Sequence, residues 1–361
     1  MKILISRVGA MGDILHTLPA VADLHFQKPD WQIDWAVDPR WRSLLVADTS
    51  TEGNLDPRWE PLLVAGTKTI VTRTHTVPTK DWSASPFSLA TLRSILALRQ
   101  QIRRERYDLV VDLQGTLRSA VIGKFAHAKN YFGFADPREA FAARLYQQTA
   151  PHLGTHVVDS NAALLSAATG LTVTPRPFAL PITRWAEDWA EREAVFARPL
   201  AVLGPGGGWA AKHWPTAHYG ELARRLKTMG FDVAVNAPRA DDPIANAVVE
   251  DSGHAARLVV CNVAGLIALL RRTDLFIGGD SGPTHLAASL AIPTVALFGP
   301  TDPARNGPWG PGPKRVLRDP GAVTSYKHTA TPDPSLARLK IEEVMDAVWG
   351  LAVNPTSAGT P

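Results

Sequence analysis

The chain has 361 residues, 45% of them hydrophobic, with a formal net charge of +4 and a sequence pI of about 9.2. At roughly 100–200 residues per domain, this length predicts two globular domains with substantial cores. The small, evenly spread positive charge excludes a nucleic-acid-binding stripe, although it suits an anionic ligand or a membrane surface.

The N-terminal segment, MKILISRVGAMGD, predicts a strand and a tight turn rather than a targeting sequence. Its apolar run of about five residues is too short for a signal peptide, and no stretch reaches the roughly 18 apolar residues of a membrane span. We therefore expect a cytoplasmic protein. The basic cluster 99–106 has two interpretations: it holds the protein at the inner leaflet of the inner membrane, or it is an ordinary solvated face.

The first half of the chain alternates apolar strands with amphipathic helices. Strands are predicted at 2–8, 32–37 and 107–113, and helices at 12–27, 89–106 and 116–126. The Pro- and Trp-rich stretch 48–87 shows no clear periodicity.

A second series of strands and helices begins near Pro199. Strands are predicted at 200–203, 231–236, 257–260, 275–277 and 294–298, and helices at 218–229, 243–251, 263–272, 284–290 and 341–351. This alternation predicts an α/β protein with two doubly wound Rossmann-like domains, whose ligands bind at the carboxyl ends of the strands. The Pro-rich segment 172–198 is the predicted linker, so that we expect domains at 1–175 and 176–353 and a disordered tail at 354–361.

The loop between the first strand and the first helix contains Asp13. Its glycines, Gly9 and Gly12, do not have the G-x-G-x-x-G spacing of a dinucleotide site. At the carboxyl end of the sheet Asp13 could take a proton from an attacking hydroxyl, or merely cap the helix. His16, three residues on, lies on the same helix face and is a candidate acceptor contact or an ordinary wall residue.

Two glycine-containing loops in the second half predict anion sites. The segment 204–215 (GPGGGWAAKHWP) places Gly207, Gly208 and Lys212 after a strand, where a phosphate can approach the backbone and a point charge. The segment 278–287 (GGDSGPTHLA) is a strand, a turn and a helix N-terminus, with Ser281 as the expected N-cap. There Asp280 could accept from a sugar hydroxyl, and His285 could donate to a phosphate or pack on a strand.

A third loop, 236–242 (NAPRADD), offers carboxylates for ribose hydroxyls. One of Asp241 and Asp242 fits a helix N-cap and leaves the other free. Cys261, the only cysteine, reads as a small buried apolar residue in this region, and we include it in the wall of the candidate donor site.

Taken together, these segments resemble the lipopolysaccharide heptosyltransferases, glycosyltransferase family 9. The resemblance is carried by 11–20 (MGDILHTLPA), 212–215 (KHWP), 280–288 (DSGPTHLAA) and 107–115 (YDLVVDLQG) followed by Arg118 and Ser119. The amino-acid sequence of the first stretch is most similar to that of heptosyltransferase I. The chain departs from the family at Ala240, where a glutamate is usual and Asp241 follows, and in the glycines and Trp209 before Lys212.

The resemblance implies a GT-B fold, with an acceptor-binding first domain and a nucleotide-sugar-binding second domain. In this fold the terminal helix, here 341–351, commonly crosses back to the first domain. The resemblance also implies ADP-L-glycero-β-D-manno-heptose as donor, a Kdo-lipid A acceptor and inversion at the anomeric carbon. The family's base falls on Asp13, its phosphate lysine on Lys212 and its sugar-binding aspartate on Asp280. The remaining candidates are Gly282 and Thr284 for the donor, and Arg118 and Arg138 for the acceptor.

No DxD pair or histidine cluster with ligand spacing occurs, so we predict turnover without a metal or cofactor. Other family 9 transferases, such as heptosyltransferase II or III, remain alternatives. An NAD-dependent oxidoreductase or epimerase would need a glycine fingerprint and a Tyr-x-x-x-Lys pair, which the sequence lacks. A non-catalytic nucleotide-sugar sensor is a further alternative.

Overall fold

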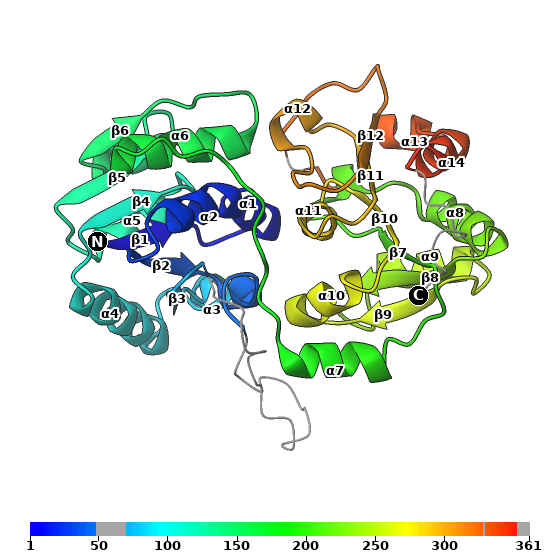
Figure 1. Cartoon of the computed structure of the whole chain (residues 1–361), viewed down its shortest axis with the longest axis horizontal. Coiled ribbons are helices and arrows are strands. Elements are labelled where there is room, and N and C mark those ends of the chain that lie inside the picture. Colours follow the sequence, from blue (N-terminus) through cyan, green and yellow to red (C-terminus); the bar gives the residue numbers. More distant parts are fainter. Residues whose placement is uncertain (48–69, 328, 352–361) are drawn as a thin grey trace. The chain divides into compact units, whose positions relative to one another are not determined.

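The computed structural model describes residues 1–47, 70–327 and 329–351, so the predicted tail and most of 48–87 lie outside the described residues (Figure 1). The described residues divide into two compact units between Pro181 and Ile182, a little beyond the position predicted from the sequence. Each unit contains one parallel six-stranded sheet with helices on its faces.

The first unit is built on strands β1 to β6. They are β1 (Lys2–Ser6), β2 (Gln32–Val37), β3 (Arg73–Thr76), β4 (Leu109–Asp112), β5 (Asn130–Phe134) and β6 (Gln148–Ala150). The helices are α1 (Met11–Leu15), α2 (Leu18–Gln27), α3 (Thr79–Ala84), α4 (Leu89–Arg104), α5 (Leu117–Lys124) and α6 (Val157–Thr169), with short 3-10 turns η1 (Pro39–Leu44) and η2 (Ala140–Leu145).

The second unit repeats this plan. Its strands are β7 (Leu200–Gly204), β8 (Asp232–Ala237), β9 (Arg257–Val260), β10 (Leu275–Gly279), β11 (Thr294–Phe298) and β12 (Lys314–Arg318). Its helices are α7 (Arg184–Arg192), α8 (Thr216–Thr228), α9 (Pro243–Asp251), α10 (Val263–Leu270), α11 (Gly282–Ser289), α12 (Pro303–Asn306), α13 (Pro334–Arg338) and α14 (Ile341–Trp349), with the 3-10 turn η3 (Ala210–Lys212).

The two sheets share one topology. The strand order is β3-β2-β1-β4-β5-β6 in the first and β12-β11-β10-β7-β8-β9 in the second, which is the same order read from the opposite edge. All strand pairs in the described residues are parallel, as in nucleotide-binding doubly wound folds. The winding therefore reverses between β1 and β4 in one unit and between β7 and β10 in the other, and ligands of such sheets bind beyond those strand ends.

The predicted first helix, 12–27, is instead two helices. α1 ends at Leu15 and α2 begins at Leu18, with Pro19 in its first turn. Proline has no N–H to donate to the carbonyl of the residue four positions earlier, so a continuous helix through this point would lose a hydrogen bond. The break places His16 and Thr17 in the connection between the helices.

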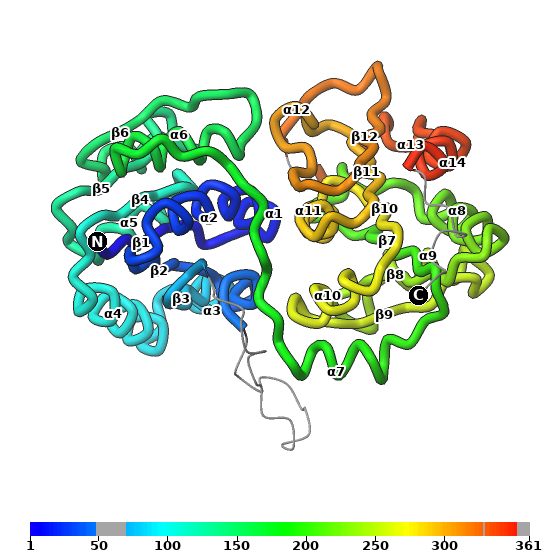
Figure 2. Tube along the Cα trace, viewed as in Figure 1, coloured from blue at the N-terminus to red at the C-terminus, as the bar shows by residue number. Residues whose placement is uncertain are grey.

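The predicted linker is partly helical, which corrects the sequence-based interpretation. α7 lies within it and packs Ala186 and Ala190 against Ala264 and Ala268 of α10. The stretch before it runs along the first unit, where the backbone N–H of Arg176 donates to the carbonyl of Pro19 at 3.2 Å (Figure 2). Small alanine faces let two helices approach closely, a packing signal hidden by the charges on the other side of α7.

The terminal helix α14 belongs to the core of the second unit. It packs against α8, β11 and β12, and Val344 and Val348 are buried in that core. The sequence allowed this helix to cross back to the first domain, but α14 is instead packed in the core of the second unit. No helix in the described part of the chain is long and apolar enough to cross a membrane.

Candidate functional site

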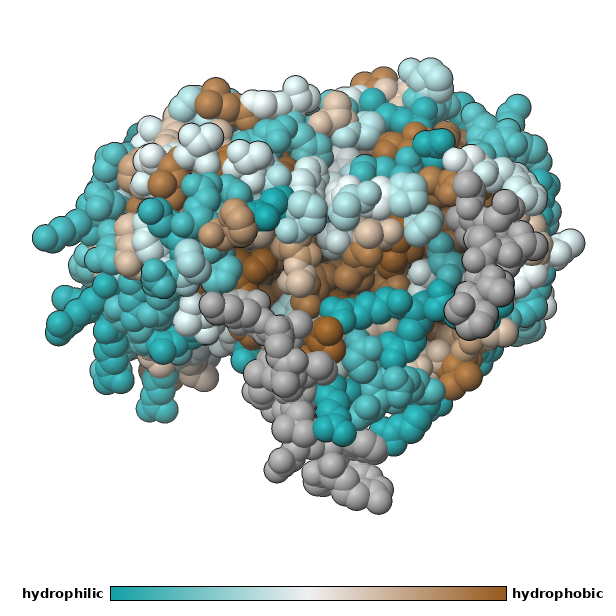
Figure 3. All heavy atoms as spheres, viewed as in Figure 1, coloured by the Kyte–Doolittle hydropathy of each residue, from teal (hydrophilic) through white to brown (hydrophobic). Residues whose placement is uncertain are grey.

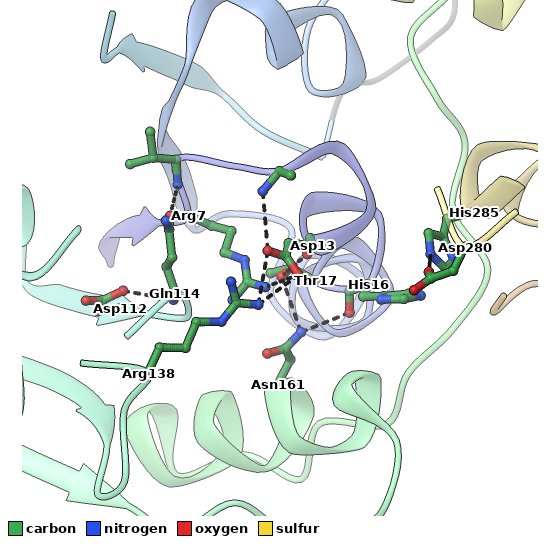
Figure 4. Close-up of polar contacts among 12 residues, drawn as sticks. Arg7, Asp13, His16, Thr17, Asp112, Gln114, Arg138, Asn161, Asp280 and His285 are labelled. Carbon is green, nitrogen blue, oxygen red and sulfur yellow. Dashed lines mark hydrogen bonds and ion pairs between the residues drawn. The ribbon is translucent and has the colours of Figure 1, made fainter. Parts of the chain in front are cut away.

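The base candidate Asp13 lies at the switch point of the first sheet, in the first turn of α1. Its carboxylate accepts from Nη2 of Arg138 at 3.1 Å through both oxygens and lies 2.9 Å from Nη2 of Arg7 (Figure 4). It also accepts from the backbone N–H of Ala10 at 3.3 Å. Asp13 is therefore paired with two arginines.

The two arginines differ in exposure. The side chain of Arg7 is 3% exposed, whereas that of Arg138 is 53% exposed. Burial disfavours the charged carboxylate, but Arg7 and then Arg138 outweigh it and lower the pKa of Asp13 to about 2. Asp13 is thus ionised at neutral pH, as a proton acceptor must be.

A second carboxylate, Asp112, is buried at the end of β4 and interacts electrostatically with Arg7. It accepts from the backbone N–H groups of Gln114 and Gly115 and from the hydroxyls of Ser119 and Tyr146, at 2.9–3.1 Å. Burial nevertheless raises the pKa of Asp112. These bonds fix the β4–α5 turn. The side chain of Gln114 in this turn accepts from the backbone N–H of Val8 at 2.7 Å and so connects the turn to the loop that contains Asp13 (Figure 4).

His16 and Arg118, both candidate acceptor residues, have different surroundings. His16 is 4% exposed and contacts the ring of His156 edge-on at 5.3 Å, while its carbonyl accepts from Nδ2 of Asn161 at 3.0 Å. His16 therefore fits the interpretation as a wall residue. Arg118 is exposed on the first turn of α5, where an anionic acceptor group can reach it.

Lys212 lies at the switch point of the second sheet, after the glycine loop that follows β7. Its Nζ is 2.5 Å from Oδ2 of Asp280 and 5.1 Å from the centre of the Trp209 ring. The glycines have two roles: a Cβ on Gly279 would lie 2.8 Å from the Lys212 carbonyl, whereas a Cβ on Gly208 would meet nothing within 4 Å. Gly279 lets strand and loop approach, and Gly208 leaves open backbone for a ligand.

Asp280, after β10, is the centre of a buried polar cluster. Besides Lys212, it accepts from Oγ1 of Thr301 at 2.7 Å and from Nε2 of His285 at 3.1 Å (Figure 4). Burial opposes its ionisation, but His285 and Lys212 outweigh burial and hold the pKa of Asp280 well below its usual range. His285 is thus bonded to Asp280 through Nε2, and its contact with a phosphate stays a prediction.

The N-terminus of α11 differs in one respect from the prediction. Ser281 occupies the N-cap position, but its hydroxyl does not accept from the helix and lies 3.3 Å from that of Thr284. Thr284 is fully buried and donates to the carbonyl of Gly279 at 2.5 Å. The first turn, beginning at Gly282, is thus not capped by a side chain, and its backbone N–H groups are the part of this motif that suits an anion.

The third loop divides its carboxylates as the sequence allowed. Asp242 caps α9 by accepting from the N–H groups of Ile244 and Ala245, at 3.2 and 3.0 Å. Asp241 is 82% exposed and pairs with Arg239. Cys261 is half-buried rather than buried and accepts from Asn236 at 3.4 Å. Burial raises the pKa of its thiol to about 12, so the thiol is neutral at physiological pH.

Two members of these clusters were not predicted from the sequence. Arg7 lies directly after β1. A charged residue at the carboxyl end of a buried strand is a sequence signal that could have identified it as a site residue. Thr301 follows β11 in a Gly-Pro-Thr turn and carries no such signal. Among residues 1–47, 70–327 and 329–351, no three His, Cys, Asp or Glu side chains are grouped as a metal site would require.

Comparison with solved structures defines the class. The chain is similar to the E. coli heptosyltransferase WaaC with ADP, with a TM-score of 0.76, 23% identity, and coverage of 98% of this chain and 100% of that one. It is also similar to the E. coli ADP-heptose LPS heptosyltransferase II, with a TM-score of 0.70, 20% identity and coverage of 97% and 98%. These likenesses show the fold: two parallel α/β units of the GT-B type.

The sequence comparison shows the family. Residues 95–331 match glycosyltransferase family 9 (heptosyltransferase), and the chain belongs to this family of glycosyltransferases. Lipopolysaccharide heptosyltransferase 1 of Pseudomonas aeruginosa is 27% identical over 339 residues, which cover 93% of this chain and 89% of the relative. The protein of the same name from E. coli K12 is 26% identical over 318 residues, with coverage of 86% and 91%.

Proposed function

We propose that this enzyme transfers L-glycero-D-manno-heptose from ADP-heptose to the Kdo region of the lipopolysaccharide inner core, with inversion at the anomeric carbon. Relatives named lipopolysaccharide heptosyltransferase 1 that align over most of the chain support the reaction. The observation that carries the chemistry is the pair of switch-point clusters, one with an ionised carboxylate at Asp13 and one with an ammonium group at Lys212.

The reaction is a single displacement. The acceptor hydroxyl oxygen attacks the anomeric carbon as the bond from that carbon to the β-phosphate oxygen breaks, and the bonding electrons leave with ADP. Asp13 takes the hydroxyl proton. Lys212 and the first N–H groups of α11 stabilise the charge that grows on the departing diphosphate. The mechanism requires both units to act on one sugar.

The electrostatics of Asp13 suit a late proton transfer. A carboxylate with a pKa of about 2 is a weak base, so it does not compete for a proton before the carbon–oxygen bond to ADP has weakened. Arg7 keeps this carboxylate ionised and is a positioning residue, because it is buried behind Asp13. Arg138 and Arg118 are exposed and supply positive charge for the phosphates and carboxylates of the acceptor.

The second unit supplies the donor site. Asp280 already accepts from three donors, and a carboxylate has about four acceptor positions, so one remains for a heptose hydroxyl. In this proposal Gly207 and Gly208 allow the diphosphate to approach the backbone, and Asp241 accepts from the ribose hydroxyls. We place the enzyme in the cytoplasm, at the inner leaflet where its lipid acceptor resides.

The test is ADP release with ADP-heptose and a panel of defined Kdo-lipid acceptors, with and without EDTA. Acceptor-dependent release that EDTA does not change is the expected result. A sensor would bind ADP-heptose without releasing ADP, and a heptosyltransferase II or III would respond only to acceptors that already carry heptose. Either outcome would replace the proposed reaction.

A further inference from the structure

Helix α4 of the first unit has an exposed apolar face that its own fold does not use. Leu89, Leu92 and Leu96 are 71%, 53% and 50% exposed, and Phe87, just before the helix, is 100% exposed. Residues three and four apart lie on one helix face, so the three leucines form a row. Leu98 and Ile102 face the opposite way, into the core.

The same helix carries an uncompensated positive charge. Arg93, Arg99, Arg103 and Arg104 are exposed, and residues 82–104 contain no Asp or Glu. Within the described part of the chain, no carboxylate pairs with these four arginines. The next acidic residue, Glu105, is already shared by Lys2 and Arg73. Figure 3 shows hydrophilic side chains projecting from the surface over α4.

We infer that the exposed face of α4, with Phe87, is a docking surface for a bilayer that contains anionic lipids. A helix whose apolar row lies beside a basic set, without acids, binds in the plane of the lipid interface, because the leucines enter the acyl boundary and the arginines meet anionic headgroups. A symmetric dimer through this face would set the four arginines against their own copies. The charge therefore favours an anionic lipid surface over a second copy of the chain.

The position of this docking surface fits the reaction. Strand β3 ends at Thr76, and α4 begins thirteen residues later, after α3. The apolar, N-terminal half of α4 therefore lies toward the carboxyl edge of the sheet, which is also the edge of Asp13. This inference rests on the proposed function and extends it. An acceptor anchored in the bilayer would be presented on the same side of the first unit as the base, Asp13.

The experiment is flotation of the full chain with vesicles of phosphatidylcholine, with or without about 30% phosphatidylglycerol. Wild type is expected to bind the anionic vesicles, less at high salt, and to leave neutral vesicles largely free. Leu92→Gln with Leu96→Gln, and separately Arg99→Gln with Arg103→Gln, should each lower the partition coefficient by roughly tenfold or more.

Matched controls come from the second unit. Val323→Gln changes a residue that is 79% exposed, and Arg184→Gln with Lys327→Gln removes two exposed charges; both should bind as wild type does. Because all these side chains are exposed, thermal unfolding should be unchanged. Wild-type protein that ignores anionic vesicles, or α4 variants that bind them as well as the controls do, would overturn the inference. So would wild-type self-association that the leucine variant abolishes.

Heptose transfer, measured in parallel, separates this inference from the proposed function. With a deacylated, water-soluble Kdo acceptor, the α4 variants should turn over like wild type, whereas with vesicle-embedded acceptor they should lose activity along with binding. Vesicle binding without any transfer by wild type would remove the proposed function and leave the docking surface intact. Transfer to both acceptors without vesicle binding would do the opposite.

Discussion

Replacing Asp13 by Asn keeps the shape of the side chain and removes its charge and its ability to accept a proton. A positioned base contributes about 100- to 10,000-fold to the rate, so kcat should fall by at least this factor, equivalent to about 3–5 kcal/mol in the barrier. ADP affinity should stay the same, because the donor cluster around Lys212 belongs to the other unit.

The same change also affects folding. A pKa depressed from 3.8 to about 2 corresponds to roughly 2 kcal/mol of favourable interaction of the Asp13 carboxylate, and the variant leaves Arg7 buried without its anion. Urea unfolding should register this loss. Asp23→Asn is the control. The buried carboxylate of Asp23 accepts from the side chain of Gln27 in α2 and from the backbone N–H of Thr174, and it lies away from the switch point. This variant should lose stability but not turnover.

The two measurements together can refute the reasoning about Asp13. Turnover of Asp13→Asn should be followed by ADP release at saturating donor and acceptor, and ADP binding by calorimetry. Unchanged turnover would remove Asp13 from the mechanism. A rate loss that Asp23→Asn reproduces at equal stability would assign the effect to folding instead.

Further predictions concern the second unit and the pH dependence of stability. Lys212→Met should weaken ADP binding by about 10- to 100-fold, as loss of one charge-assisted contact does, and calorimetry with the isolated nucleotide checks this without any acceptor. Gly279→Ala puts a methyl group 2.8 Å from the Lys212 carbonyl, so the loop must shift; weaker ADP binding and a stability loss of about 1–3 kcal/mol are expected, and a variant with wild-type affinity would show that the close approach is unimportant. Because the pKa of Asp13 is lowered on folding, its contribution is complete above the unfolded value near 4 and is lost as the pH falls through about 2. The stability difference between wild type and Asp13→Asn should therefore narrow over that range in urea titrations, and a constant difference would contradict the assigned pKa.

The sequence predicted the long, strongly patterned elements well. The strand 32–37, the helix 243–251 and the strand 294–298 coincide with β2, α9 and β11. β3 (RTHT) and β6 (QTA) escaped prediction because they are short, polar edge-side strands whose pairing comes from their neighbours rather than from their own apolar pattern. α7 escaped because its alanine face is recognised only against α10.

The candidate site was predictable in its positions but not in its pairings. Asp13 and Lys212 could be chosen because each follows a buried strand before a helix. The pairings of Asp13 with Arg138 and of Asp280 with Lys212 depend on which side chains meet across the ends of different strands. Spacing along one segment does not determine such contacts, since they join segments as far apart as Asp13 and Arg138.

The central claim, a single displacement with Asp13 as base, is tested most directly by the anomeric configuration of the product. The enzyme would be given ADP-L-glycero-β-D-manno-heptose and a soluble Kdo acceptor, and the new linkage read by NMR. The mechanism predicts one added heptose in the α configuration. A β-linked heptose would mean retention and a different mechanism, and absence of the disaccharide would contradict heptose transfer itself.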